Sequence, residues 1–372
     1  MVTEQKDLVT LVAVGDVSPN REDPPSIFRY CGDVFRTADV VFGQMEAPLS
    51  DRGTPAFVHH APRRVAAKNI SALTEEGAGF DVMSHACNHS MDYGWEAFFD
   101  TLDSLKKNKI AVVGAGKNIE EARRPAILER KGTRVGFLAY LSVIEIGCIA
   151  DEDRPGCVPL RSSHYYDQVD PQPGSPPLII TRLFPEDKRF MEEDIKKLRP
   201  HVDVLVVSMH CGVVFVPALI AMYQKEAGYA AIDAGADLVL QHHAHILRGI
   251  EVYKGKVIFY GLNHFAVEHH LGKVRPWAGG RFLEKINYHK GKRETWFPHD
   301  SLKTMIAKAY IQEKKVQKVS YIPAYITPNL EPEVVTRKDR RAQEVFDYVQ
   351  QISESQDLKV RFAWDGDEVL IL

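Results

Sequence analysis

The sequence has no surplus of basic residues, no long apolar run and no paired cysteines. Lys and Arg number 47 against 50 Asp and Glu, a net charge of −3, so the composition gives no support for a nucleic-acid partner. No apolar run approaches the ~20 residues that cross a membrane, and residues 1–7 lack the pattern of a signal peptide. The five cysteines form no CxxC pair, as is typical of a reducing compartment. We therefore expect a cytoplasmic protein with no membrane anchor and no nucleic-acid partner.

The chain is long enough for one large α/β domain or for two to three smaller domains. Its 372 residues are 45% hydrophobic and 26% charged, which is ordinary for a globular protein. We predict a main domain over residues 1–300, with a surface excursion rich in proline, glycine and aspartate over residues 151–175. Residues 301–372 predict a hairpin, an amphipathic helix over 339–354 and a final hairpin, all packed on the same domain.

Six short apolar segments each end near a polar residue, which is the pattern of buried strands that open into loops. In open α/β sheets, ligands bind beyond the carboxyl ends of the strands, so we expect the six ends to converge on one site. The segments and the polar residues that follow them are 8–14 before Asp16, 38–43 before Glu46, 80–84 before Asn88 and His89, 202–209 before His210, 237–240 before His243, and 258–260 before His264.

These strand ends offer the ligands that divalent metals prefer. Carboxylate, imidazole and amide oxygen suit such ions, and the chain has 15 histidines. His243 and His245 lie two residues apart, so at a strand end both imidazoles can face one ion. Asp92 follows His89 closely enough to fix its tautomer. Each residue alone is explained by a turn, a cap or a packed histidine, and their joint occurrence is what predicts a metal site.

Seven short motifs then occur in a characteristic order between about Leu8 and Tyr325. They are Gly15-Asp16, Gln44-Met-Glu46, Ala86-Cys-Asn88-His89-x-x-Asp92-Tyr-Gly94, Gly114-Ala-Gly116, Ser208-Met-His210-x-Gly212, Gly235-Ala-Asp237 and His242-His-Ala-His245. In this order they resemble the CapA (poly-γ-glutamate capsule synthesis) family of the calcineurin-like metallophosphoesterase superfamily. The resemblance implies an α/β fold, a four-layer αββα sandwich of metallophosphatase type, with a metal centre at the sheet edge and the catalytic domain over residues 1–300.

The resemblance also implies roles for individual residues. His89 matches a histidine that acts on the substrate rather than on the metal, with Asp92 as its partner, and His264 adds an imidazole where the family has Gly-Asn-Phe. We take these three as the candidate catalytic residues. The positions that match metal ligands are Asp16, Glu46, Asn88, His210, His243 and His245.

One departure from the family pattern concerns the number of metal ions. Ser18 stands where dinuclear phosphoesterases carry a second imidazole. We therefore expect one tightly held divalent ion (Mn, Zn, Fe or Ca) and a second site that is weak or absent. The expected ligands of the tight site are His210, His243 and His245, with help from Asn88 or Asp16.

Four residues are candidates for binding the substrate. Arg63 and Arg64 can hold a carboxylate or phosphate, although such a pair also suits the solvated start of a helix. Tyr165 and Tyr166 lie in the excursion, where they can line a pocket or cover the sheet. Further histidines that we consider, with surface positions as their simpler explanation, are His59, His60, His164, His269 and His270.

The function that we favour from these residues and from the resemblance is metal-dependent hydrolysis of a phosphoester or amide bond. The metal would activate a water molecule, and His89 would act as general acid. The expected substrate is a small molecule or peptide that carries an anionic group. Two alternatives stay open, a metal-dependent isomerase resembling a peptide Cα epimerase and a non-catalytic protein that binds an anionic polymer.

Overall fold

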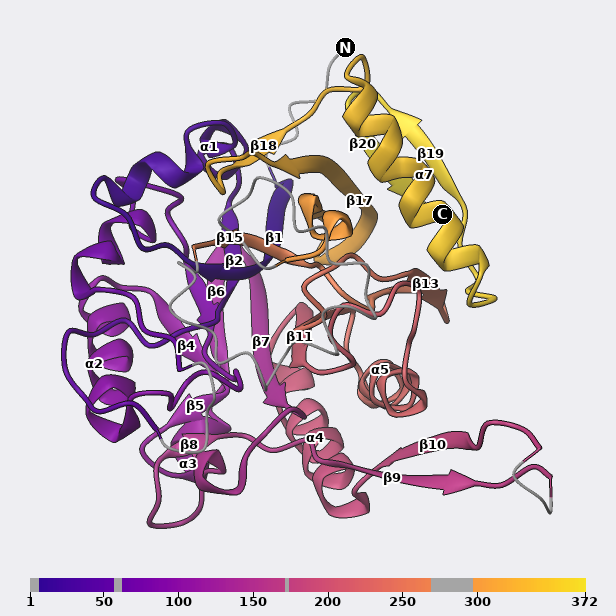
Figure 1. Cartoon of the computed structure of the whole chain (residues 1–372). Helices are drawn as coiled ribbons and strands as arrows, with labels where there is room; N and C mark the ends of the chain where they lie inside the picture. The colour runs from indigo at the N-terminus through magenta and orange to yellow at the C-terminus, as the bar shows by residue number, and fades with distance from the viewer. Residues whose placement is uncertain (1–6, 57–61, 171–173, 269–296) are drawn as a thin grey trace.

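The structure is a computed structural model that describes residues 7–56, 62–170, 174–268 and 297–372. Two β-sheets stacked face to face form its centre, with helices on the outer faces (Figure 1). All six apolar segments predicted from the sequence are strands. They are divided between the two sheets: three lie parallel in the large sheet and three lie parallel in the small one.

The large sheet has the order β19-β20-β17-β16-β1-β2-β3-β4, with β15 on β1 and β18 on β17. Strand β1 lies near its middle because β2 pairs with it in parallel on one side and β16 pairs antiparallel on the other. The strands are β1 (Val9–Ser18), β2 (Val40–Met45), β3 (Val82–Ser84), β4 (Ala111–Val113), β15 (His264–Val267), β16 (Lys303–Gln312), β17 (Lys315–Ile326), β18 (Pro332–Val334), β19 (Phe362–Asp365) and β20 (Glu368–Ile371).

The small sheet has the order β13-β14-β12-β11-β7-β6, with β14, β12, β11 and β7 parallel. Its strands are β6 (Ala126–Arg130), β7 (Thr133–Leu141), β11 (Val204–His210), β12 (Leu238–His242), β13 (Ile250–Tyr253) and β14 (Lys256–Phe259). The inner faces of the two sheets share one apolar core. Phe42 of β2 and Phe137 of β7 stack across it, with ring centroids 5.6 Å apart.

Helices cover both outer faces and complete four layers. Helices α4 (Pro185–Leu198) and α5 (Met222–Ala234) pack on the small sheet, for example through Met191 and Ala227. The large sheet is covered through Phe28 and Phe35, which belong to η1 and α1. The predicted α/β fold, a four-layer αββα sandwich, is therefore confirmed. The remaining helices are η1 (Pro24–Phe28), α1 (Gly32–Arg36), η2 (Ala67–Ala72), α2 (Gly94–Lys107), α3 (Ile119–Ala122), η3 (Ile146–Cys148), η4 (Arg199–His201), η5 (His299–Leu302) and α7 (Arg340–Glu354).

The C-terminal segment contributes strands to the large sheet as well as a helix. The predicted hairpins are β16–β17 and β19–β20, and the predicted helix is α7, which Asp339 caps. Val345 and Val349 of α7 join the core between the sheets. Because β16 pairs directly with β1, this segment supports the strand that carries Asp16.

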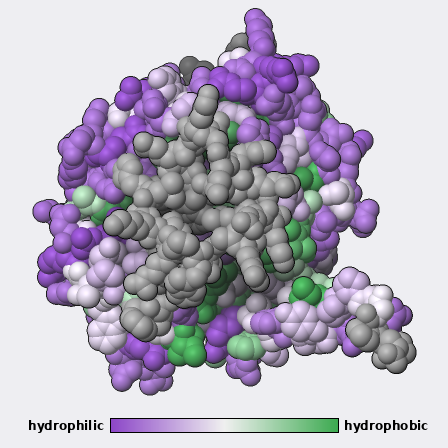
Figure 2. Space-filling model, in the orientation of Figure 1, coloured by the Kyte–Doolittle hydropathy of each residue, from purple (hydrophilic) through white to green (hydrophobic). Residues whose placement is uncertain are grey.

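The excursion predicted over residues 151–175 contains two short strands, each of which pairs with a strand outside it. Strand β8 (Gly156–Cys157) pairs with β5 (Ala115–Gly116), and β9 (Ser162–Asp167) pairs with β10 (Leu178–Leu183). The β9–β10 hairpin projects from the body of the molecule (Figures 1 and 2). Across the described ranges, no helix is both long and apolar enough to span a bilayer. All five cysteines are buried free thiols.

Candidate metal centre

Strand ends from both sheets meet at one buried place, as the sequence predicts. Asp16 lies near the end of β1, where the register of β1 with its neighbours shifts. Gly15 makes this possible, because a Cβ at position 15 would lie 1.9 Å from the carbonyl oxygen of Asn263. The Asp16 N–H donates to the same carbonyl at 3.1 Å. The segment before β15 is thereby held against β1, and its first residue, His264, pairs with Asp16.

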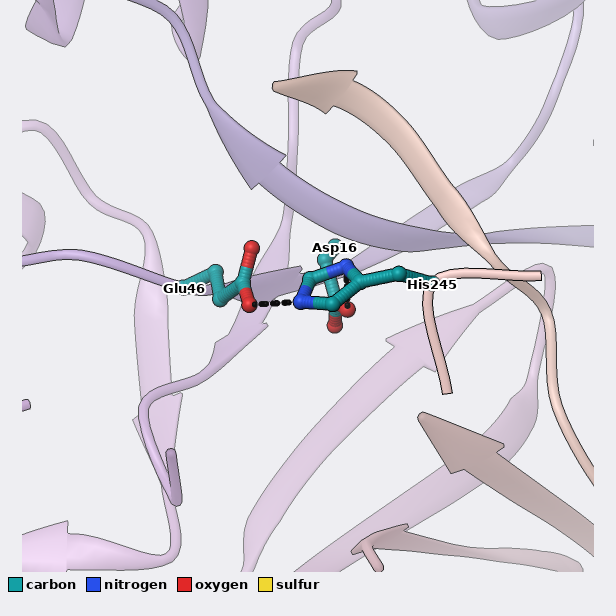
Figure 3. Close-up of side chains that lie close together, drawn as sticks. All are labelled: Asp16, Glu46 and His245. Carbon is teal, nitrogen blue, oxygen red and sulfur yellow. Dashed lines mark ion pairs between the residues drawn. The ribbon is translucent and has the colours of Figure 1, made fainter. Parts of the chain in front are cut away.

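Asp16, Glu46 and His245 form one group of ligand atoms that lie within 4.8 Å of one another. The imidazole of His245 lies between the two carboxylates (Figure 3). Its Nε2 is 2.8 Å from Glu46 Oε1, and its Nδ1 is 3.5 Å from Asp16 Oδ2. The exposed fractions of the two acids are 0%, so water does not screen them.

Asn88, His210 and His243 form a second group beside the first. His210 Nε2 lies 2.8 Å from Asn88 Oδ1 and 3.2 Å from His243 Nδ1. His210 Nδ1 lies 3.8 Å from Asp16 Oδ1, which connects the two groups. The sequence expectation placed His210, His243 and His245 around one ion. In the structure, His245 lies against Glu46 and Asp16, whereas His210 lies against Asn88 and His243. The ring centroids of His243 and His245 are 6.2 Å apart.

Burial sets the protonation of these groups. Burial, and then repulsion from Glu46, raise the pKa of Asp16 well above its ordinary value. Burial, and then the neighbouring His245, lower the pKa of His243 to about 3, and burial and His243 together lower the pKa of His210. His210 and His243 are therefore neutral at pH 7, which is the form that binds metal.

The unpaired atoms at this place match the needs of a cation. Both carboxylate oxygens of Asp16, together with Nδ1 of His210 and Nδ1 of His245, are buried and make no hydrogen bond of normal geometry. Buried polar atoms without partners are rare and costly. Carboxylate oxygens and neutral imidazole nitrogens are also the donors that borderline divalent ions prefer. The residues present therefore fit a divalent cation.

His89 and Asp92 form a hydrogen-bonded pair next to these groups. His89 Nδ1 lies 2.7 Å from Asp92 Oδ2, and the same carboxylate oxygen accepts the backbone N–H of Arg63 at 2.5 Å. Asp92 is fully buried, whereas 9% of His89 is exposed. Repulsion from His89 also contributes to the lowered pKa of His243. Asp92 thus fixes the ring of a histidine that borders the candidate metal centre.

The two arginines lie in different surroundings. Arg63 Nη1 lies 3.3 Å from Glu46 Oε1, so its guanidinium reaches the centre. Arg64 donates to the carbonyl of Arg52 at 2.7 Å and covers the ring of Tyr93, with its guanidinium carbon 4.3 Å from the ring centroid. The structure therefore brings Arg63 to the ligands and directs Arg64 to other contacts.

The remaining predicted residues are placed as follows. The ring centroid of His264 lies 5.7 Å from that of His245. The His264 ring also stacks on the ring of Phe297, with centroids 4.2 Å apart. Tyr165 and Tyr166 lie on β9 of the projecting hairpin, with 42% and 65% of their surfaces exposed, and are not brought to the centre. His164 is on the same strand. His59, His60, His269 and His270 lie outside the described residues.

The two histidines of the His-x-His pair converge for a reason other than strand alternation. Strand β12 ends at His242, so His243 and His245 follow it in a loop. Both have left-handed backbones, with φ of 86° and 50°, which are strained for a non-glycine residue. The carbonyl of His245 is held by the hydroxyl of Ser301, which donates to it. Tertiary contacts therefore set the direction of these imidazoles.

Sequence reasoning missed three residues at this centre. Ser301 and Asn263 support the His245 loop and β15, because Asn263 Nδ2 donates to the carbonyls of Ser301 and Lys303. Their only signal in the sequence is the position of Asn263 just before His264. His242 is fully buried, neither of its ring nitrogens has a hydrogen-bond partner, and burial lowers its pKa to about 3. Its signal is its place in the run of histidines before His245.

Comparisons with known proteins find relatives that match most of this chain. The family model described as bacterial capsule synthesis protein PGA_cap matches residues 10–268. PGA biosynthesis protein CapA of Bacillus subtilis (strain 168) is 28% identical over 306 residues, which are 79% of this chain and 70% of that protein. Capsule biosynthesis protein CapA of Bacillus anthracis is 25% identical over 299 residues, 77% of this chain and 64% of that protein. Among solved structures, calcineurin-like phosphoesterase YfkN from Bacillus subtilis has a TM-score of 0.40 and 12% identity, covering 94% of this chain and 98% of that one.

Proposed function

Because this chain belongs to the bacterial capsule synthesis protein PGA_cap family, we propose that it is a metal-dependent hydrolase of a phosphoester or amide bond. Its substrate is a small molecule or peptide with an anionic group. The observation that carries the proposal is the buried group of Asp16, Glu46 and His245, whose ligand atoms lie within 4.8 Å of one another. Two buried carboxylates beside an imidazole are costly without a cation and well suited to one.

Asp16, Glu46 and His245 would hold one divalent ion, and Asn88, His210 and His243 offer donors for a second, weaker site. When bound, the ion supplies a Lewis acid and lowers the pKa of bound water. The chain's own residues provide binding and proton transfer. Arg63, beside Glu46, orients the anionic group of the substrate. Its guanidinium also offsets part of the negative charge of the two carboxylates.

His89 acts as the general acid in this proposal. Its Nδ1 is held by Asp92 at 2.7 Å, so the proton that reaches the leaving group comes from Nε2. The buried carboxylate keeps the ring in one orientation and stabilises its protonated form. His264 stacks on Phe297 and is 3% exposed, which favours a supporting role for it over direct contact with the substrate.

The experiment combines metal analysis with turnover on two substrate classes. Protein purified without chelators is assayed for bound divalent metal, and then incubated with a phosphodiester and with glutamyl peptides in deuterated water. The proposal expects product release that depends on metal. Deuterium uptake at Cα without cleavage would instead support the isomerase, and neither product nor uptake would support a binding protein.

A matched pair of variants makes this test specific. Glu46→Gln removes a charge from the ligand group and should lose metal and turnover together. Glu22→Gln removes a charge from a side chain that is 99% exposed and pairs only with Lys68 among the described residues, so it should keep both. Full metal content and turnover in Glu46→Gln would contradict the proposal.

A further inference from the structure

Arg248 is a buried cation that has no anionic partner among the residues the structure describes. It lies three residues after His245, between that loop and β13, and only 1% of its surface is exposed. Its Nη2 donates to the carbonyl of Val213 at 2.5 Å. Its Nε and Nη1 are buried and have no hydrogen-bond partner. Within the described ranges, no carboxylate forms an ion pair with it.

An uncompensated charge of this kind is costly. Arginine is almost never fully buried unless it is paired, and an unpaired buried ion costs several kcal/mol. Burial lowers the pKa of Arg248 to about 10, so the guanidinium still carries its charge at pH 7. The backbone makes room for it, because a Cβ at Gly261 would lie 2.6 Å from Arg248 Cγ. The fold therefore accommodates a cation and leaves two of its nitrogens unsatisfied.

A second cation and an unpaired hydroxyl lie in the same region. Tyr348 of α7 interacts electrostatically with Arg248, and its hydroxyl is buried without a hydrogen-bond partner. Lys303 Nζ lies 4.7 Å from the centroid of the Tyr348 ring, and its side chain is 11% exposed. Asp300 pairs with Lys303 at 2.9 Å. The region therefore holds two positive charges, one negative charge and donors that face no acceptor.

We propose that Arg248, Tyr348 and Lys303 form a subsite for one oxyanion group, a carboxylate or a phosphate. The subsite is built on segments that also carry residues of the metal centre. Arg248 shares a loop with His245, and Val213, its one acceptor, shares a loop with His210. Ser301, two residues before Lys303, holds the carbonyl of His245. The assignment of this oxyanion to the substrate rests on the proposed function, whereas the subsite itself does not.

The first measurement is anion binding by calorimetry, with inorganic phosphate and glutarate as probes. Arg248→Met should weaken the binding of at least one probe by about 10- to 100-fold, the size expected for lost charge-assisted hydrogen bonds. Arg248→Lys should keep part of the affinity. Arg340→Met is the control, because its side chain is 91% exposed and pairs only with Glu344 in the described structure. Tighter binding of glutarate identifies a carboxylate as the source, and tighter binding of phosphate identifies a phosphate.

The second measurement separates a binding role from a structural one. In denaturant titrations without added anions, Arg248→Met should be at least as stable as the parent protein, because it removes an unpaired buried charge and keeps most of the volume. Loss of stability together with unchanged anion binding would overturn the proposal. So would equal binding of both probes by the parent and Arg248→Met.

The failure of this proposal can be distinguished from failure of the proposed function. Asp16→Asn alters the metal centre and leaves Arg248 in place, so it should retain the Arg248-dependent binding of the probe even where metal is lost. If the chain turns out not to be a hydrolase, the calorimetric difference between Arg248→Met and Arg340→Met is unaffected. If Asp16→Asn abolishes all anion binding, the anion belongs to the metal centre and the subsite is refuted.

Discussion

The substitution Asp16→Asn should change stability in opposite directions with and without metal. Asp16 and Glu46 are fully buried, and their ligand atoms lie within 4.8 Å of each other. At an effective dielectric constant of about 20, two unit charges at that separation repel by about 3 kcal/mol. Asparagine removes this repulsion and presents an amide to Glu46. Without metal, the variant should therefore be more stable by up to about 3 kcal/mol above the pH at which Asp16 ionises.

The same substitution should remove most of the stabilisation by metal. A ligand that binds only the folded state stabilises it by RT ln(1 + [L]/Kd), about 2.7 kcal/mol at a hundredfold excess over Kd. Denaturant titrations at pH 8, with chelator and with added Mn²⁺ or Zn²⁺, measure both effects in one experiment. The parent should gain stability with metal, and Asp16→Asn should gain little.

The test is decided by whether Asp16→Asn is more or less stable than the parent protein in chelator. Asp33→Asn is the control, because its side chain is 94% exposed and pairs only with Arg36 in the described part of the chain, and it should respond to metal like the parent. A variant Asp16→Asn that is less stable in chelator and equally stabilised by metal would refute the account. That outcome would mean that hydrogen bonding of Asp16, rather than its charge, organises the site.

The other predictions concern proton transfer, substrate binding and pH. His89→Asn should keep its metal while turnover falls by about 10²- to 10⁴-fold, whereas His243→Asn should lose metal and turnover together, as elemental analysis and rate assays will show. Arg63→Ala should raise KM more than it lowers kcat, because its guanidinium orients the anionic group; an unchanged KM would exclude that role. Without metal, burial lowers the pKa of His243 to about 3 from 6.5, so its contribution to stability is complete above pH 6.5 and lost as pH falls toward 3. Denaturant titrations of His243→Asn and the parent from pH 8 to 4 should show a smaller loss of stability in the variant, because His210 and His242 still titrate in both proteins.

The six apolar strands were predictable because their signal is local. Runs such as residues 202–209 are continuously apolar and end at a polar residue, which is the pattern of a strand buried on both faces. The C-terminal helix was also predictable from the sequence, because α7 has an amphipathic stripe and a capping aspartate at position 339. The pairing of the C-terminal strands was not predictable. Strand β16 pairs with β1 across about 300 residues of chain, and no local pattern specifies that register.

The ligand types were predictable from residue chemistry, but their grouping was not. His243 and His245 reach the centre through left-handed backbones at both positions rather than through strand alternation, so their spacing in the sequence did not specify which partner each imidazole faces. Ser301 influences His245 from the tail, where the sequence shows no histidine or other sign of a site. In the sequence, Arg248 is indistinguishable from an ordinary polar residue of a loop. Only the structure shows that it is buried with unpaired nitrogens among the described residues.

The sequence by itself determined many of the elements and the set of residues that could bind metal, because apolar periodicity and ligand chemistry are properties of short segments. The four-layer class was implied by the resemblance of the ordered motifs to a known family. Tertiary structure decided which ligands face each other, which of the two neighbouring arginines reaches Glu46, and where buried charge is left uncompensated. These outcomes depend on distances of a few ångströms between side chains from distant segments. Such distances are set by the packing of two sheets and the loops between them.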